Sequence, residues 1–207
     1  MSTINKRCNM IGIIDYGAGN LGSVKKALDY LNTKNKIVST PEELNDCTKL
    51  ILPGVGNFGD IMKSLEANNL IQPLKQAIKK KPFFGICLGY QVLFEISEES
   101  PGINGLGILK GKVVKFQQKR KVPQIGWNNI KFKKQSNLLQ DIPDNAFVYF
   151  LHSYYPVPEE DIGITQTEYG ETFVSAINND HIYATQFHPE KSGTIGLKIL
   201  RNFIEKC

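Results

Sequence analysis

Hydrophobic residues in the first hundred positions follow two alternating patterns, one typical of buried strands and the other of amphipathic helices. Short apolar runs that predict strands occupy residues 10–16, 36–39, 49–52 and 82–87. Helical patterns follow them at residues 20–32, from Thr40-Pro41-Glu42-Glu43, around 59–80 and from 88 to about 97. A strand that is repeatedly followed by a helix predicts a parallel sheet with helices on its faces.

The pattern changes after Pro101, where short β-rich segments separated by turn residues replace the alternation. These segments cover residues 106–116, 123–132, 146–156, 163–168, 172–178 and 181–187, and a last helix covers about 192 to 206. No repeat or long linker divides the sequence. We therefore predict one α/β domain over residues 1–207, with a mixed, mostly parallel central sheet flanked by helices. A β-hairpin elaboration is expected in the second half, and residues 1–9 are expected to be an N-terminal extension.

Composition narrows the class of protein. The 207 residues are 41% hydrophobic and 22% charged, as in soluble globular proteins. No apolar run approaches the roughly 18 residues of a membrane span, and no signal-peptide core follows the first residues, so we expect a cytoplasmic protein without a membrane partner. The net charge is +5, but the basic clusters lack interleaved aromatic residues, so nucleic-acid binding is not expected. The four cysteines form no CxxC pair, so no metal site or disulfide framework is expected.

The segment most informative about chemistry joins an apolar strand to a helix through Gly85-Ile86-Cys87-Leu88-Gly89. Glycines two residues before and after a cysteine permit the sharp turn of a nucleophile elbow, which exposes the reactive side chain at its apex. There the N-terminus of the helix would favour the thiolate, and the N–H of Leu88 could bind an oxyanion. The alternative is a buried structural cysteine. The flanking glycines favour the nucleophile.

A thiolate nucleophile needs a base, and the chain has three histidines. Pro189 biases His188 towards an extended backbone, in which residues two apart point the same way. Glu190 can then lie beside the imidazole and stabilise its protonated form. His152 has no acidic residue at a useful spacing, and His181 adjoins a turn, where we expect it to be exposed. Local sequence favours His188 as the base but leaves a structural histidine possible.

Three motifs together carry a resemblance to a known family. They are the Gly-rich turn Pro53-Gly54-Val55-Gly56 at the end of a strand, the Cys87 segment, and Phe187-His188-Pro189-Glu190. In this combination they resemble the class I glutamine amidotransferases. Within that family the sequences IIDYGAGN (13–20), IGWN (125–128), HSYY (152–155) and HPEKSG (188–193) resemble the glutaminase subunits of imidazole glycerol phosphate synthases. Gln124 departs from the pattern, because the family often has histidine there.

The resemblance implies a catalytic triad and a substrate. Cys87, His188 and Glu190 would form the triad, which hydrolyses L-glutamine through a cysteinyl thioester without a cofactor. The oxyanion hole would use the backbone of Gly54 and Val55 with the Leu88 N–H. Glutamine would be held by Gly54, Val55, Leu88, Gln91 and the backbone near Ser153 and Tyr154.

The resemblance also implies a protein partner. In this family the ammonia passes through an internal channel to a (β/α)8 cyclase, with which the glutaminase forms a heterodimer in histidine biosynthesis. We expect the docking surface to include Asn20, Trp127, Asn128 and Lys191, together with the loop 15–20. Trp127 could instead be a core residue.

Three alternatives compete with this interpretation. A paralogous glutaminase could supply ammonia to a sugar amidotransferase in surface polysaccharide synthesis, because the acceptor chemistry belongs to the partner. The GxGxxG sequence at Gly17–Gly22 also fits an NAD-binding oxidoreductase. That reading lacks an acidic residue at the tip of the second strand and leaves Cys87 unexplained. A catalytically silent binding module is disfavoured because all three triad residues are present.

Overall fold

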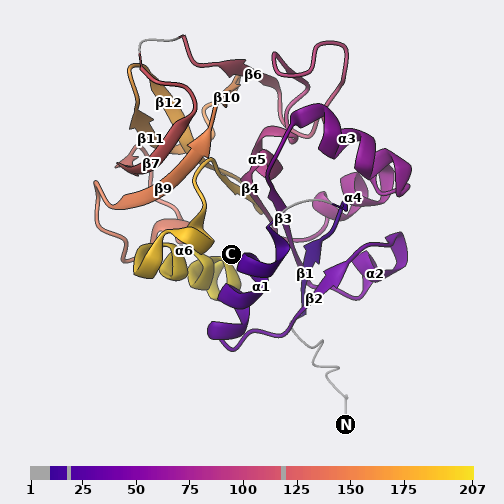
Figure 1. The fold of residues 1–207 in the computed structure, drawn as a ribbon. Helices are drawn as coiled ribbons and strands as arrows, with labels where there is room; N and C mark the ends of the chain where they lie inside the picture. The colour runs from indigo at the N-terminus through magenta and orange to yellow at the C-terminus, as the bar shows by residue number, and fades with distance from the viewer. Residues whose placement is uncertain (1–9, 18–19, 118–119) are drawn as a thin grey trace.

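A mixed β-sheet runs through the centre of the protein, whose computed structural model describes residues 10–17, 20–117 and 120–207 (Figure 1). Within these residues eight strands pair in the order β2-β1-β3-β4-β13-β12-β11-β8. The parallel part comprises β2 (Asn35–Val38), β1 (Ile11–Ile14), β3 (Lys49–Gly54), β4 (Phe83–Cys87) and β13 (Ile182–Thr185). The antiparallel part comprises β12 (Thr172–Asn179), β11 (Gly163–Glu168) and β8 (Lys131–Phe132). The predicted fold class is confirmed.

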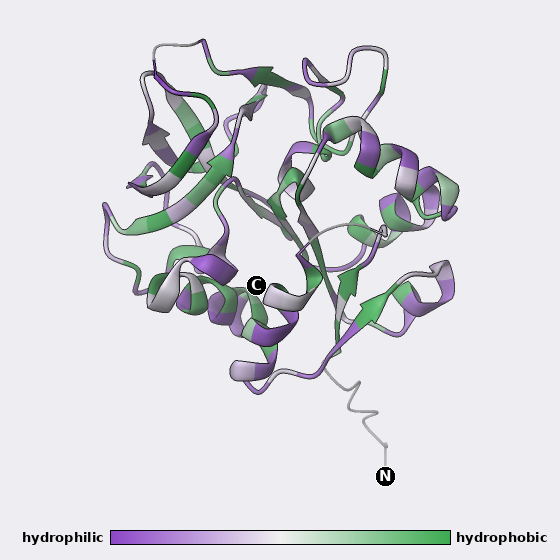
Figure 2. Cartoon of the chain, viewed as in Figure 1, coloured by the Kyte–Doolittle hydropathy of each residue, from purple (hydrophilic) through white to green (hydrophobic). Residues whose placement is uncertain are grey.

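Helices cover both faces of this sheet. One face carries α1 (Leu21–Tyr30) and α6 (Gly193–Lys206), and the other carries α2 (Pro41–Asn45), α3 (Phe58–Ala67) and α4 (Ile71–Ile78). Alternate residues of β3 serve the two cores, because Leu50 and Leu52 pack towards α3 and α4 while Ile51 packs towards α1 and α6. Figure 2 shows the resulting concentration of hydrophobic residues along the central strands.

The second half adds two small sheets to the central one. β10 (Tyr154–Pro158), β6 (Gly111–Lys115) and β5 (Ile96–Ser97) form one, and β7 (Gln124–Asn129) pairs with β9 (Phe147–His152) in the other. Two short 3-10 helices, η1 (Asn137–Leu139) and η2 (Pro189–Lys191), complete the described elements. The predicted β-hairpin elaboration is therefore present, and its β7–β9 hairpin supplies one wall of the site described below.

Two predicted helices differ from the structure. The helix expected around 59–80 is divided into α3 and α4, because Asn69 adopts a left-handed backbone with φ of 55°. The helix expected over 88–97 is the single turn α5 (Leu88–Gln91). Backbone N–H groups of residues 105–109 donate to the carbonyls of residues 92–95, and these bonds replace the ones a longer helix would make.

Part of the sequence-based prediction lies outside the described residues. This applies to the N-terminal extension, residues 1–9, and to residues 18–19 of the GxGxxG loop. Among the helices that are described, none has the length and apolar character needed to cross a membrane.

Candidate active site

Cys87 stands at the junction of β4 and α5 (Leu88–Gln91), where the backbone turns sharply. Its φ of 54° and ψ of −106° are unusual for a residue with a side chain, so the turn is strained. Gly89 is required because a Cβ there would lie 1.9 Å from the backbone oxygen of Leu52 on β3. A Cβ at Gly85 would lie 2.6 Å from the oxygen of Gly89. The backbone therefore has the elbow geometry that the sequence predicts.

The sulfur of Cys87 is buried among polar groups of other elements. The residue is 5% exposed, and its Sγ lies 3.7 Å from the carbonyl oxygen of Leu151 and 3.6 Å from Nε2 of Gln186. Because α5 has only four residues, the helix dipole expected to favour a thiolate is small. The expected effect of the helix N-terminus on the thiolate therefore stays a prediction, and these neighbouring polar groups act on the sulfur beside it.

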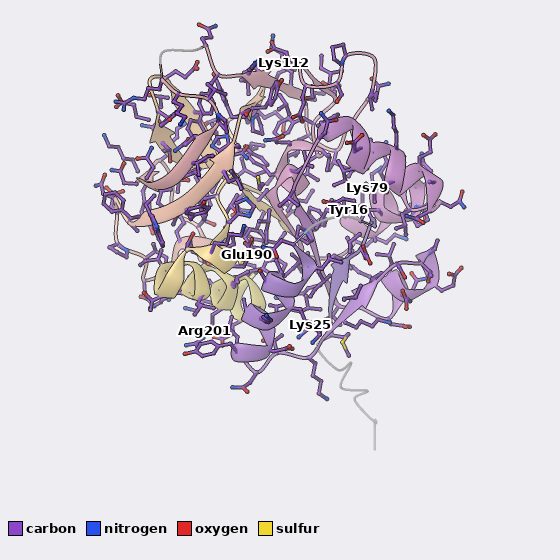
Figure 3. The ribbon with its side chains drawn as sticks, viewed as in Figure 1. Tyr16, Lys25, Lys79, Lys112, Glu190 and Arg201 are labelled. Atoms are coloured by element: carbon purple, nitrogen blue, oxygen red, sulfur yellow. The ribbon has the colours of Figure 1, made fainter. Side chains whose placement is uncertain are left out.

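His188 reaches this position because β13 and β4 pair directly. Thr185 lies opposite Ile86, so the residues that follow both strands emerge at the same edge of the sheet. The N–H of His188 donates to the carbonyl of Tyr149 on β9 at 2.9 Å, which fixes the backbone there. Its Nδ1 lies 2.9 Å from Oε1 of Glu190, and both side chains are only 1% exposed. Figure 3 labels Glu190 next to the ribbon of α6.

The pairing of His188 with Glu190 has a different backbone origin from the one predicted. Glu190 lies in η2, so a tight turn, rather than an extended chain, brings its carboxylate back to the imidazole. Burial alone would lower the pKa of His188. Attraction and hydrogen bonding to Cys87, together with the bond to Glu190, instead raise it to about 10. No hydrogen bond of standard geometry yet reaches Nε2 within the described residues. The raised pKa favours the protonated imidazole, whose attraction to Cys87 does not depend on a hydrogen bond of ideal geometry.

A cavity of about 220 Å³ opens beside Cys87. Its walls include five of the six residues expected to hold the substrate, namely Val55, Leu88, Gln91, Ser153 and Tyr154. Gly54 does not line it. A Cβ at Gly54 would lie 2.6 Å from the Gly89 nitrogen, so this glycine lets β3 pack against the elbow. Its expected contact with the substrate, which would be made through the backbone, stays a prediction.

Two of the polar groups expected to face the substrate are engaged within the protein. The N–H of Val55 donates to Oη of Tyr16 at 3.2 Å, and the phenol lies 3.4 Å from the Val55 carbonyl. Burial raises the pKa of Tyr16, so the phenol stays protonated and can both donate and accept. The amide nitrogen of Gln91 donates to the carbonyl of Tyr154 at 2.8 Å and to Oε1 of Gln186 at 3.2 Å. The site thus contains more internal hydrogen bonding than the motifs predict.

Glu99 and His152 line the cavity although the sequence analysis did not select them. Glu99 accepts a hydrogen bond from the N–H of Phe58 at 2.7 Å, and burial raises its pKa. Burial lowers the pKa of His152 to about 3, and its ring nitrogens lie 2.9 Å from the Tyr154 carbonyl and 3.1 Å from Oε1 of Gln124. His152 is therefore neutral. The HSYY motif contained a signal for His152, and the β7–β9 register, which pairs it with Gln124, places it in the wall.

The residues expected at a docking surface lie in different environments. Trp127 is 56% exposed, which excludes the core alternative, and its ring packs edge-on against Tyr149 of the neighbouring strand. Asn128 points to the opposite face of β7, where its amide donates to the carbonyl of Glu168. Lys191 is exposed on η2, and Asn20 is half-buried at the start of α1. Trp127 and Asn128 therefore cannot contact one partner through the same face of the hairpin.

The remaining candidate residues have structural environments. His181 is half-buried rather than exposed, and its Nε2 lies 2.8 Å from the carbonyl of Ile78. Cys47, Cys87 and Cys207 are free thiols, and no cluster of three potential metal ligands occurs in the described part of the chain. Glu43, which follows β2, accepts hydrogen bonds from the N–H groups of residues 39 and 40 and so caps α2. This carboxylate is therefore already committed and offers no ribose-binding group to a dinucleotide.

Residues 12–207 match the family Glutamine amidotransferase class-I. The chain belongs to the class I glutamine amidotransferase family. It is 54% identical over 201 residues to the imidazole glycerol phosphate synthase subunit HisH of Methanocaldococcus jannaschii, covering 95% of this chain and 99% of that protein. The HisH of Aquifex aeolicus is 51% identical, with 94% and 96% covered. The resemblance to this group of amidotransferases is therefore confirmed.

Solved structures support the same fold at much lower identity. A crystal structure of a glutamine amidotransferase superimposes with a TM-score of 0.75 at 20% identity, covering 94% of this chain and 97% of that one. The structure of PurLQS from Thermotoga maritima gives a TM-score of 0.74 at 17% identity over the same fractions. These likenesses bear on the fold alone.

Proposed function

We propose that this amidotransferase is the glutaminase subunit of an imidazole glycerol phosphate synthase, which hydrolyses L-glutamine and delivers the ammonia to a (β/α)8 cyclase. The observation that carries the proposal is the buried pair of His188 and Glu190 close to Cys87, which itself lines a cavity. The HisH relatives, which match nearly the whole chain, support the choice of synthase.

The first half-reaction is attack by the Cys87 thiolate on the side-chain carboxamide of glutamine. The resulting oxyanion is stabilised by backbone N–H groups at the elbow, of which Leu88 lines the cavity. His188 then gives its Nε2 proton to the departing nitrogen, which leaves as ammonia. Attraction to Cys87 helps to keep that proton on the imidazole. Formation of the C–S bond in the tetrahedral intermediate neutralises the sulfur, which weakens this attraction, lowers the pKa of His188 and makes the proton transfer to the departing nitrogen easier.

The second half-reaction is hydrolysis of the thioester. Neutral His188 takes a proton from water, the hydroxide attacks the thioester carbonyl, and glutamate leaves while the sulfur recovers its negative charge. Glu190 holds Nδ1–H of the imidazole throughout, so Nε2 faces the reacting atoms in both half-reactions. The glutamic acid side chain formed in this step loses its proton to the released ammonia or to bulk water, and the cycle ends with the Cys87 thiolate and protonated His188 restored.

Charged groups around the cavity fit the two ends of an amino acid. The Glu99 carboxylate lies in the wall of the Cys87 cavity and can receive the α-ammonium group of glutamine. An adjoining cavity of about 470 Å³ shares Ser153 and Tyr154 with the first and is also lined by Lys115 and Arg120. These cations lie on the side where the α-carboxylate would emerge. The arrangement favours a zwitterionic substrate over a simple amide.

The partner is proposed to dock on the β7–β9 hairpin. Ile125, Trp127 and Phe147 are 56–61% exposed and share one face of it, which gives an apolar surface next to the cavity. η2 contacts both this hairpin and α1, so Lys191 and Asn20 lie on elements that adjoin it. We keep these two residues and Trp127 in the proposed interface. Asn128 would act there by bracing the hairpin through its bond to the carbonyl of Glu168.

Cys87→Ala tests the glutaminase directly. The variant should lose glutamine hydrolysis, whereas its complex with the cyclase should still form product from added ammonium salt. Cys207→Ala, which removes another thiol, serves as the control and should keep both activities. Retention of glutamine hydrolysis by Cys87→Ala would contradict the proposed chemistry.

The partner is tested by reconstitution. We expect the cyclase of histidine biosynthesis to bind the chain and stimulate its glutaminase activity. A sugar amidotransferase should do neither. The reverse outcome would assign the chain to surface polysaccharide synthesis, because the acceptor chemistry belongs to the other subunit.

A further inference from the structure

Gln186 lies against the reactive sulfur, although neither the motifs nor the proposed mechanism uses it. The residue follows β13 and is completely buried. Its backbone N–H donates to the carbonyl of Ser175 at 2.9 Å, which fixes the main chain two residues before His188. Its side-chain Nε2 lies 3.6 Å from Sγ of Cys87, within hydrogen-bond distance for sulfur. A buried amide is thus directed at the atom that carries out the reaction.

The orientation of this amide is determined by its second contact. Oε1 of Gln186 accepts a hydrogen bond from Nε2 of Gln91 at 3.2 Å. The same nitrogen of Gln91 donates to the carbonyl of Tyr154 at 2.8 Å, so it is held as a donor and its partner on Gln186 must be the oxygen. The NH₂ group of Gln186 therefore faces the sulfur. A continuous series of hydrogen bonds links the cavity wall at Tyr154 to Cys87.

The other groups that face the sulfur have different effects on its charge. The Leu151 carbonyl, at 3.7 Å, can accept a proton from the thiol but repels a thiolate. His188, with Glu190 behind it, attracts the thiolate through its charge, while the phenol of Tyr16 also lies within electrostatic range. Gln186 adds a neutral donor that is present whether or not His188 holds its proton. During the reaction His188 gives its proton away, and this donor stays in place.

We propose, on the basis of the glutaminase function above, that Gln186 is a catalytic residue whose side-chain N–H stabilises the negative charge on the Cys87 sulfur. The hydrogen bond from Gln186 to the sulfur weakens when the sulfur becomes neutral in the thioester. It regains its strength when water releases glutamate and the thiolate forms again. Gln91 and Tyr154 act as positioning residues for this donor. A glutamine substrate that contacts Gln91 would therefore contact the residue that positions the Gln186 donor.

The experiment compares Gln186→Met with Gln124→Met. Both substitutions replace a buried glutamine near the cavity by an apolar side chain of similar length, but Gln124 contacts His152 rather than the sulfur. For Gln186→Met we expect a roughly tenfold fall in kcat with little change in KM, the lower end of the effect of losing one hydrogen bond to a charged atom. The rate at which iodoacetamide alkylates Cys87 at pH 7, followed by mass spectrometry of its peptide, should fall by the same factor. Gln124→Met should leave that rate unchanged.

Gln186→Glu provides a second variant of native size. It keeps an acceptor for Gln91 but can place a carboxylate against the thiolate, so alkylation should slow by about tenfold or more. A fall in kcat without any change in alkylation would make Gln186 a packing residue and overturn the proposal. An equal fall in alkylation for Gln124→Met would do the same. Failure of the glutaminase function itself appears separately, as glutamine hydrolysis retained by Cys87→Ala.

Discussion

Gly89 of α5 packs directly against the backbone of Leu52 on β3, so the substitution Gly89→Ala tests the geometry of the elbow at Cys87. The added Cβ would lie 1.9 Å from the oxygen of Leu52, whereas Cβ contacts below 3.0 Å are essentially never found. Because the obstructing atom belongs to the backbone of β3, α5 and β3 must separate by about 1 Å. Overpacking of this kind costs about 3 kcal/mol of unfolding free energy. A displacement of about 1 Å at a catalytic group lowers kcat roughly 100-fold.

Urea denaturation and glutamine turnover of the same preparations measure the two effects. Gly22→Ala is the matched control, because Gly22 lies in α1 with no atom within 4 Å of the new methyl group. Replacing a helical glycine by alanine without a clash should stabilise the protein by about 0.5 kcal/mol and leave kcat unchanged. If Gly89→Ala were as stable and as active as Gly22→Ala, the tight packing of the elbow against β3 would be refuted.

Three further predictions concern stability and partner binding. Lys49→Met should lower the unfolding free energy by about 2 kcal/mol in urea denaturation, because the Lys49 ammonium group donates to three carbonyls at the end of α6. Lys198→Met is the control; it removes a surface ion pair and should have almost no effect on the unfolding free energy. His152 has a pKa of about 3 in the folded protein and 6.5 ordinarily, so only the unfolded chain gains its proton as the pH falls from 6.5 towards 3. Stability should therefore decrease by about 1 kcal/mol per pH unit in that range, and His152→Asn should show a shallower decrease. Trp127→Ala should weaken cyclase binding roughly 30-fold by calorimetry without affecting stability, whereas Tyr30→Ala, at another exposed aromatic residue, should bind normally.

The catalytic part of the site is largely predictable from sequence because its determinants are local. Glycines on either side of Cys87 define the elbow over five residues, and Glu190 lies only two positions from His188. The alternation of strands and helices also predicts that Cys87 ends a central strand, since parallel strands present their carboxyl ends at one edge. Short-range constraints of this kind leave a visible pattern in the chain.

The rest of the cavity could not be predicted because it depends on packing between distant segments. Glu99 reaches it through the turn after β5, which has no sequence motif, and the HSYY motif at His152 does not reveal the β7–β9 register that places this residue in the wall. The expected helix over 88–97 was wrong for a similar reason, because N–H groups from residues 105–109 take its carbonyls. Gly54 was correctly singled out as a close-approach glycine, and the motif did not reveal that atoms of the elbow are the ones that approach it.

The central place of β13 has a consequence for how the enzyme becomes active during synthesis. β13 pairs with β4 on one side and β12 on the other, so it joins the parallel and antiparallel parts of the sheet. Phe83 of β4 pairs with Ile182 of β13. Because these residues lie far apart in the sequence, the pairing of the two strands is slow to form. A nascent chain that has released β4 but not β13 holds Cys87 without His188 and Glu190, and by the proposed mechanism it cannot consume glutamine. Ammonia production therefore begins only when the two halves of the sheet have been joined.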